Sequence, residues 1–187
     1  EIDLLLGAPQ TLRGTVIDKN TRKPISEARI YLAALPTSIE HPELGHTGGV
    51  ALTDMNGAFQ IENLSEGDIH IGVVHSDYLP ALETISIGAD SASEHAIALT
   101  RGGTVLGSVT REGFPVSNTR VQLMVEVDGE KRLHRGAETD VGGNYVIRAL
   151  DSGFYELVIW GPAESDGPFK QNIEIALGKD TVVNASY

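Results

Sequence analysis

Apolar and polar residues alternate along most of this chain with a period of two, which is typical of half-buried β-strands. The alternation is clearest over residues 28–33 and 119–126. A later run in each half alternates in the same way, and the inward-facing side chains expected there are Ile69, Ile71 and Val73, followed by Tyr155, Leu157 and Ile159. Each of these segments predicts a strand with one face in a core and the other in solvent.

Residue pairs that contain glycine mark the expected tight turns between these strands. Asn56-Gly57 and Gly142-Gly143 each lie between an alternating run and an aromatic residue, and their residue types accept positive φ angles. Asp128-Gly129 has the chemistry of a two-residue hairpin turn. Short strands separated by such turns predict two facing antiparallel sheets, so the fold class is all-β, with sandwiches of about seven strands.

The sequence repeats itself once. Gly14 and Gly107 are 93 residues apart, and Thr53 and Thr139 are 86 apart. A period of about 90 residues fits a whole small domain better than a solenoid repeat, so we expect two tandem domains. The four blocks that recur in the same order lie at residues 14–16, 24–30, 53–59 and 64–69, and again at 107–109, 115–121, 139–145 and 150–155.

The repeat also predicts where the domains begin and end. We expect a first sandwich over residues 11–101 and a second over residues 102–187. The run Ile2–Gly7 before the first block resembles the run Ala96–Leu99, which closes the first copy. Residues 1–10 are therefore expected to be the last strand of a preceding module or a strand lent to the first one, and the parent protein is expected to continue upstream.

The four blocks together resemble the carboxypeptidase regulatory-like domain. They are Gly-x-Val, Pro-x-x-x-Ala-x-Ile (Pro-x-x-x-Thr-x-Val in the second copy), Thr-Asp-x-x-Gly-x-Phe/Tyr and Leu-x-x-Gly-x-Ile/Tyr, and they cover nearly the whole chain. The resemblance implies two tandem seven-stranded antiparallel β-sandwiches of the transthyretin-like (prealbumin-like) type, with an immunoglobulin-like Greek key. It also implies that the modules accompany a zinc carboxypeptidase, a surface or outer-membrane protein or a polysaccharide-degrading enzyme, and carry no catalytic residues themselves.

Composition narrows the functions that remain. The formal net charge of −12 repels polyanions, so nucleic acid is not expected as a partner. The chain contains no cysteine, which excludes disulfides, thiolate nucleophiles and thiolate-bound metals. No apolar run approaches the ~20 residues needed to cross a bilayer, so this segment is not expected to insert into a membrane.

The sequence lacks the local motifs of common hydrolases and nucleotide-binding enzymes. It has no His-Glu-x-x-His, no Gly-x-Ser-x-Gly and no phosphate-binding Gly-x-x-x-x-Gly-Lys-Ser/Thr. The run Asp54–Gly57 begins like a calcium loop but lacks the later oxygen ligands, and we interpret Asp54 and Asp140 as turn residues. We therefore predict a protein that is not an enzyme, with no catalytic residue, no cofactor and no metal site.

The segment from Ala34 to Ala51 is the best sequence candidate for a binding loop, because structureless loops of this length are uncommon in compact domains. It carries two histidines and two carboxylates within seven residues, and we name His41, Glu43 and His46 as candidate ligand or partner contacts. Imidazole and carboxylate groups suit zinc. A solvated, variable loop is the favoured interpretation, and a zinc site is the alternative.

Trp160 is the only tryptophan, and it falls on the outward phase of its strand beside Gly161-Pro162. An exposed indole can stack on a sugar ring or on a partner domain. The favoured alternative is an indole that covers the end of the sandwich or a junction between modules. Trp160 is therefore the fourth candidate contact.

These observations favour structural or adhesive spacer modules of a larger extracytoplasmic bacterial protein, which is periplasmic, at the cell surface or secreted. The expected partners are neighbouring domains of the same chain and a protein or glycan ligand. The alternative function is a carbohydrate-binding accessory domain of a polysaccharide-degrading or peptidase enzyme. Only Trp160 and Tyr31 offer stacking surfaces for that alternative.

A third hypothesis concerns the Cna B-type modules of surface adhesins, which resemble these sandwiches and carry a Lys-to-Asn isopeptide bond catalysed by an acidic residue. Lys19 lies in an expected turn, and the first strand carries no lysine on its inward phase. The isopeptide hypothesis is therefore disfavoured.

Overall fold

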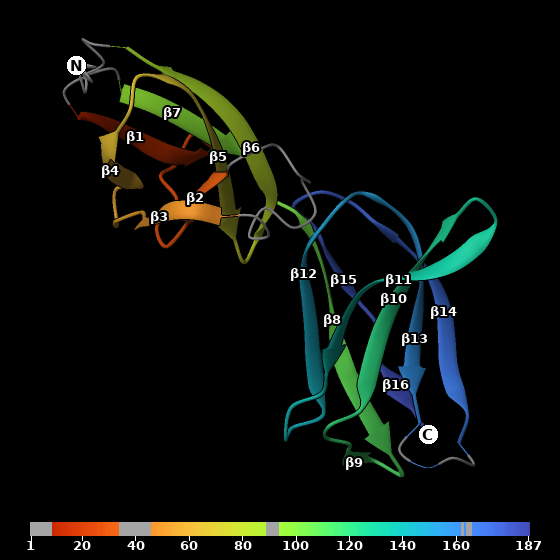
Figure 1. The fold of residues 1–187 in the computed structure, drawn as a ribbon. Coiled ribbons are helices and arrows are strands. Elements are labelled where there is room, and N and C mark those ends of the chain that lie inside the picture. Colours follow the sequence, from red (N-terminus) through yellow and green to blue (C-terminus); the bar gives the residue numbers. More distant parts are fainter. Residues whose placement is uncertain (1–8, 34–45, 89–93, 162, 164–165) are drawn as a thin grey trace, which may run out of the picture. The chain divides into compact units, whose positions relative to one another are not determined.

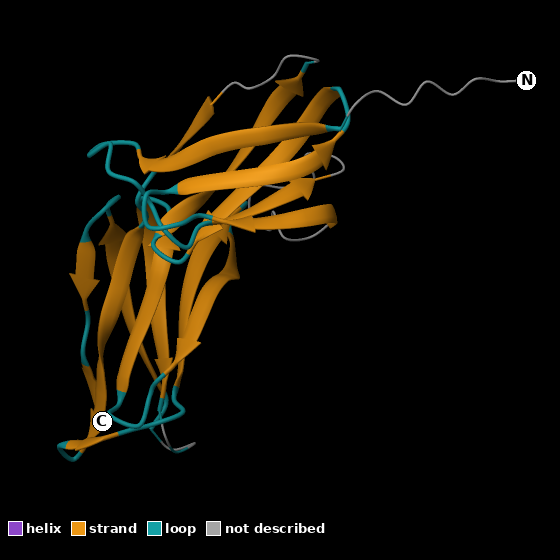
Figure 2. Ribbon diagram, turned by 90° about the vertical axis from the view of Figure 1, so that its left-hand side faces the viewer, coloured by secondary structure: helices purple, strands orange, loops and turns teal. Residues whose placement is uncertain are grey.

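The computed structural model describes residues 9–33, 46–88, 94–161, 163 and 166–187. All regular elements in these ranges are strands, as Figure 2 shows, so the predicted all-β class is confirmed. The chain divides into two compact units, Glu1–Thr100 and Arg101–Tyr187. The described strands of each sheet all belong to the same unit.

The first unit is a sandwich of a three-stranded and a four-stranded sheet (Figure 1). The strand order is β4-β1-β7 in one sheet and β3-β2-β5-β6 in the other. Both sheets contribute to the core, where Val16, Ile30, Val73 and Ile97 are fully buried. The strands are β1 (Gln10–Asp18), β2 (Arg29–Ala33), β3 (His46–Leu52), β4 (Ala58–Leu64), β5 (Gly67–His75), β6 (Tyr78–Ile87) and β7 (Glu94–Leu99).

The second unit repeats this architecture with its own core, in which Val105, Leu123, Leu157 and Ile159 are fully buried. One sheet has the order β12-β8-β15, with β9 and β16 also pairing with β8, and the other has the order β11-β10-β13-β14. The strands are β8 (Gly103–Arg111), β9 (Phe114–Pro115), β10 (Arg120–Val127), β11 (Glu130–Glu138), β12 (Asn144–Leu150), β13 (Gly153–Trp160), β14 (Pro168–Ile175), β15 (Asp180–Val182) and β16 (Ala185–Ser186).

The sheets are not antiparallel throughout, which differs from the prediction. In the first unit β1 pairs with β7 in parallel, and in the second β8 pairs in parallel with β15 and β16. The physical reason is that β6 belongs to the opposite sheet, so β7 is not tied to β6 by a hairpin. The chain crosses between layers, and its last strand can then run in the same direction as the first.

Glycine lets the first strand of each unit approach the last one closely. A Cβ on Gly107 would lie 1.7 Å from the carbonyl oxygen of Val183, and a Cβ on Gly14 would lie 2.4 Å from that of His95. The Tyr145 hydroxyl donates to the same Val183 oxygen at 2.7 Å, and burial raises the pKa of Tyr145 to about 12. The Gly-x-Val block therefore marks a packing contact between strands.

The other repeated blocks meet at a hydrogen-bonded corner, which in the first unit comprises Thr53, Asp54 and Gly57. The buried Thr53 hydroxyl donates to the carbonyl of Ile25 and accepts from the N–H of Ala28, both at 2.8 Å. Asp54 Oδ1 accepts two backbone N–H groups of its own turn at 2.8 Å. Gly57, at φ +71°, offers its carbonyl to β1. We call this set the threonine-aspartate corner.

The second unit has the same threonine-aspartate corner, built from Thr139, Asp140 and Gly143. The Thr139 hydroxyl donates to the carbonyl of Val116 at 2.6 Å and accepts from the N–H of Thr119 at 2.9 Å. Asp140 Oδ1 again accepts two backbone N–H groups at 2.8 Å. The predicted turn role of both aspartates is confirmed, and the repeated motif is explained by folding.

The predicted loop from Ala34 to Ala51 is wrong in its second part. Residues 46–51 belong to β3, which pairs antiparallel with β2, and residues 34–45 lie outside the described residues. The sequence hid this strand because Gly48 and Gly49 interrupt its alternation and the pairing with β2 shifts register after Tyr31. The predicted strand at residues 1–10 also lies outside the description, apart from Pro9 and Gln10, where β1 begins.

Asp18 is a buried carboxylate at the end of β1. Its Oδ1 accepts the N–H groups of Asn20 and Thr21 at 2.9 and 2.7 Å, and its Oδ2 accepts the Tyr78 hydroxyl at 3.0 Å. The Thr21 N–H lowers the pKa of the Asp18 carboxyl most, desolvation opposes it, and Tyr78 lowers it further. The net result is a pKa below the usual range.

A carboxyl group with a lowered pKa in the folded state stabilises the fold above its unfolded pKa of about 4, and this contribution is lost as the pH falls. We therefore expect the free energy of unfolding of the first unit to drop below about pH 4 more steeply in the native chain than in Asp18→Asn. Urea titrations monitored by core methyl NMR signals of that unit measure both slopes. Asp128→Asn, in an exposed turn of the second unit, is the control. Equal slopes for Asp18→Asn and the native chain would contradict the prediction.

Candidate binding surfaces

The structure places two of the four predicted contact residues. His46 begins β3 opposite Ala33, and Trp160 ends β13, in the other unit. His41 and Glu43 lie outside the described residues, so the zinc alternative stays a prediction. Within the described ranges, no group of three or more histidines and carboxylates is arranged to hold a metal ion.

Trp160 lies on the outer face of the four-stranded sheet of the second unit. It is 46% exposed, and its indole Nε1 donates to Gln122 Oε1 on β10 at 2.9 Å. On the neighbouring strand β14, Trp160 is paired in register with Pro168. The hydrogen bond fixes the indole edge and leaves nearly half of the residue accessible to solvent.

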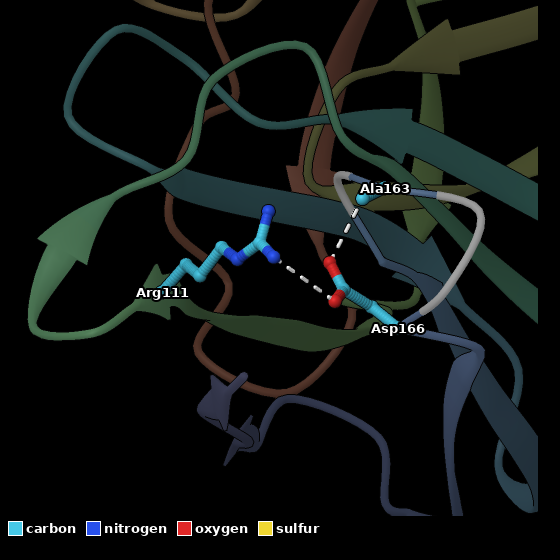
Figure 3. Close-up of polar contacts among 3 residues, drawn as sticks. All are labelled: Arg111, Ala163 and Asp166. Atoms are coloured by element: carbon cyan, nitrogen blue, oxygen red, sulfur yellow. Dashed lines mark hydrogen bonds and ion pairs between the residues drawn. The ribbon is translucent and has the colours of Figure 1, made fainter.

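The chain just beyond Trp160 is held by an ion pair, shown in Figure 3. Arg111, at the end of β8, lies 3.3 Å from Asp166 Oδ1, and Asp166 Oδ2 accepts the N–H of Ala163 at 3.0 Å. The hydroxyl of Tyr187 adds a second link by donating to the carbonyl of Ile159 at 2.7 Å and accepting the N–H of Phe169 at 3.1 Å. The β13 end that carries Trp160 is thus tied to two other parts of its unit.

The first unit has a groove of about 580 Å³ on the outer face of its four-stranded sheet. His75 Nδ1 accepts the N–H of Asp77 at 3.1 Å, so the neutral imidazole carries its proton on Nε2. Sequence reasoning identified Tyr31 as a possible stacking surface but missed the groove, because its members come from separate strands and turns. The residues that line it include Glu27, Arg29, Tyr31, Leu52, Val74 and His75.

The second unit has a groove of about 710 Å³ over the sheet β12-β8-β15. Apolar side chains of all three strands line it, together with the charged residues Arg101, Glu138, Asp140, Arg148 and Asp180. Sequence reasoning missed this groove entirely. The signal was the apolar residues on the outward phase of their strands, Leu106, Val146 and Val182.

Glu83 is a titratable group that sequence reasoning also missed. It shares the inward phase of β6 with Ile85 and Ile87, and it is half-buried. Desolvation raises the pKa of the Glu83 carboxyl, and the charge of His95 works against that shift. Glu83 is an acidic residue, the type that catalyses isopeptide formation in Cna B-type modules. That reaction also needs a lysine on the first strand, and the inward positions of β1 hold none. They are Leu12, Gly14, Val16 and Asp18.

We therefore expect no isopeptide bond in either unit. The inward phase of β8 carries Val105, Gly107 and Val109, and Lys19 is exposed in the turn after β1. Intact-mass spectrometry should give the mass calculated from the sequence. A mass lower by one ammonia per unit would contradict this prediction, and fragmentation would then locate the cross-link.

Among the described residues there is no helix whose length and apolar character would let it cross a membrane. The described side chains thus form two β-sandwich units with surface grooves, a repeated threonine-aspartate corner and one exposed indole.

These features define the first unit as a β-sandwich module. Residues 11–100 match the sequence model of the carboxypeptidase regulatory-like domain. The predicted resemblance is confirmed for this part of the chain. No curated protein sequence matches the chain.

Solved structures with similar folds include bacterial pilins. A streptococcal ancillary pilin aligns with 95% of this chain and 62% of its own, at 15% identity and a TM-score of 0.45. The shaft pilin SpaA from Lactobacillus rhamnosus GG aligns with 96% of this chain and 98% of its own, at 9% identity and a TM-score of 0.45. The chain thus spans less than two thirds of the ancillary pilin, and values this low carry no functional inference.

Proposed function

We propose that this chain contributes two non-catalytic β-sandwich modules to a larger extracytoplasmic protein, where they act as spacers or as contact modules. The observation that carries the proposal is that each unit closes a hydrophobic core with its own strands. A module that needs no side chain from its neighbour can be placed in series without changing its fold. We propose residues 11–101 and 102–187 as the two modules, both of the carboxypeptidase regulatory-like type, and residues 1–10 as a strand of a preceding module.

Small-angle scattering tests the spacer role. We expect an extended two-domain profile that one fixed arrangement of the modules reproduces. Free tumbling of the two halves, seen as different rotational correlation times in NMR relaxation, would argue against a rigid spacer. Limited proteolysis that cuts near residue 101 and leaves two folded fragments would support the proposed boundary.

We propose an extracytoplasmic bacterial location for the parent protein, in the periplasm, at the cell surface or secreted. The proposed partners are its own neighbouring domains and a protein or glycan ligand. Labelling intact cells that produce the parent protein with a membrane-impermeant amine reagent tests a surface location. Exclusive labelling after cell lysis would contradict surface exposure, and fractionation of periplasm and cytoplasm would then decide between the remaining locations.

A carbohydrate-binding accessory role is the second candidate, and exposed Trp160 is the observation that favours it. Its indole is fixed by Gln122 and open to solvent on one side. If this role holds, Trp160→Ala should weaken glycan binding by about 1 to 2 kcal/mol, roughly five- to thirtyfold, because stacking on the ring is lost. Phe154→Ala is the matched control, since Phe154 is 77% exposed on the outward phase of the same strand. A glycan array without any binder would remove this candidate.

A further inference from the structure

The outer face of the β12-β8-β15 sheet in the second unit carries an apolar row. Val146 on β12, Leu106 on β8 and Val182 on β15 occupy one register line, so the three residues lie side by side across the sheet. Val146 is 43% exposed, Val182 is 63% exposed and Leu106 is half-buried. The row crosses the groove of about 710 Å³. Three adjacent apolar side chains form a small patch, unlike the singly scattered apolar residues of an ordinary surface.

The first unit carries polar residues at the equivalent positions. Its register line consists of Gln60 on β4, Arg13 on β1 and Glu94 on β7. Arg13 Nε donates to Gln60 Oε1 at 3.2 Å. The fold therefore accepts charged and polar side chains here, and the apolar row of the second unit is not needed to form the sandwich.

Charges of opposite sign lie at the two ends of the same groove. Glu138 ends β11 and Asp140 lies in the turn before β12, whereas Arg148 is near the end of β12 and Arg101 comes just before β8. Because β8 and β12 are antiparallel, the start of one strand adjoins the end of the other. The groove thus has an acidic end, an apolar centre and an end that carries both arginines together with Asp180.

We infer that this face binds a second copy of this chain, with a two-fold axis that runs along the apolar row. Such an axis places each row against its own copy and reverses the strand direction between the two copies. Arg148 of each copy then faces Asp140 and Glu138 of the other, so opposite charges meet on the β12 side. A surface that is complementary to itself in this way fits an isologous dimer.

The other side of the row obeys the same symmetry. The axis brings Asp180 of one copy, which lies beside Thr104, to Asn184 of the other. Asn184 Oδ1 accepts the N–H and the hydroxyl of Ser108 at 2.9 and 3.1 Å, which turns its NH₂ group away from β8. An amide NH₂ donates to a carboxylate, so no like charges are brought together on the β15 side.

The size of the face predicts weak association. Three strands spaced about 4.8 Å apart, each contributing a length of about five residues, cover roughly 250 Å² of the sheet face. This is well below the ~800 Å² per partner of a stable interface. We therefore expect a dissociation constant on the order of 0.1 to 1 mM. Association of this strength matters where copies are held close together, because tethering raises their effective concentration. It is separate from the module function proposed above, and either can fail while the other holds.

Sedimentation velocity from about 20 μM to about 1 mM tests the dimer. The weight-average sedimentation coefficient of the native chain should rise over this range. The coefficient should keep its monomer value in the triple variant Leu106→Arg, Val146→Gln, Val182→Glu. This variant carries at the three row positions the residue types that the first unit has at the equivalent positions. An unchanged unfolding transition of Trp160 fluorescence, the only tryptophan signal, verifies that the second unit of this variant is folded.

Charge variants test the symmetry of the dimer. Arg148→Glu should weaken association about tenfold, and adding Glu138→Arg should restore most of it, because the paired charges are exchanged. Lys170→Glu, exposed on the other sheet, makes the same change in net charge and should have no effect. A native chain that stays monomeric at 1 mM, about the upper limit expected, overturns the inference. A dimer that still forms in the triple variant overturns it as well. So does a chain that binds a different polypeptide or a glycan through the apolar row and does not self-associate.

Discussion

Replacing Gly107 by alanine is expected to destabilise the second unit by about 3 to 5 kcal/mol. The new Cβ would lie 1.7 Å from the Val183 oxygen, 2.6 Å from its carbonyl carbon and 3.1 Å from the Tyr145 hydroxyl. Two of these atoms belong to backbone and cannot move aside as the end of a flexible side chain can. The variant must therefore separate β8 from the segment between β15 and β16, and it also disturbs the hydrogen bond of Tyr145 to Val183.

Trp160 makes the measurement specific to one unit. It is the only tryptophan and it lies in the second unit, so its fluorescence follows the unfolding of that unit alone. Urea titrations should show a lower midpoint for Gly107→Ala with an unchanged slope. The matched control is Gly14→Ala, whose Cβ would meet His95 and Phe59 in the first unit at 2.4 and 2.6 Å.

The control also decides whether the two cores are independent. Gly14→Ala should leave the Trp160 transition where it is in the native chain, while circular dichroism reports an early loss of strand signal. An equal shift of the Trp160 transition in both variants would mean that the units unfold together. A shift below about 1 kcal/mol in Gly107→Ala would mean that the strands separate easily.

The alternation of apolar residues was sufficient to predict the fold class and most strands. Ile71, Val73, Leu157 and Ile159 are buried as predicted, because a strand with one face in a core must alternate. The parallel pairing of first and last strands was not predictable in this way. Periodicity assigns faces within a strand, whereas the neighbour of a strand depends on which layer the connection enters.

The sequence motif predicted part of the threonine-aspartate corner. The turn role of Asp54 and Asp140 followed from the preference of short carboxylates for neighbouring backbone N–H groups. The role of Thr53 and Thr139 was missed, since a hydroxyl residue before a turn is usually exposed. Burial of both threonines depends on the approach of a segment more than twenty residues away, which no local pattern contains.

The binding surfaces were the least predictable part. Trp160 was found because a single indole on an outward phase is visible in the sequence. The apolar row was not, because it needs the register of three strands, and Val182 is aligned with Leu106 only through a parallel pairing. A comparison of the two halves position by position would have flagged Leu106 against Arg13, at the spacing of 93 residues.

Replacing Thr139 by valine is expected to destabilise the second unit by about 2 to 4 kcal/mol. Valine keeps the shape of threonine but cannot donate to the Val116 carbonyl or accept the Thr119 N–H. Thr139 is only 3% exposed, so water does not readily replace either partner. The cost is that of two backbone polar groups left without a hydrogen bond, which exceeds the small gain from burying an extra methyl group.

Thr139→Ser separates the hydroxyl from the methyl group of the side chain. Serine retains both hydrogen bonds and should lose only about 1 kcal/mol for the missing methyl group. The Trp160 transition in urea again measures the second unit, and Thr53→Val should leave that transition unchanged because its corner lies in the first unit. If valine were tolerated better than serine at position 139, packing and not hydrogen bonding would close the corner. The Thr-Asp pairing in the repeated block would then need another cause, since valine is at least as good a strand former as threonine.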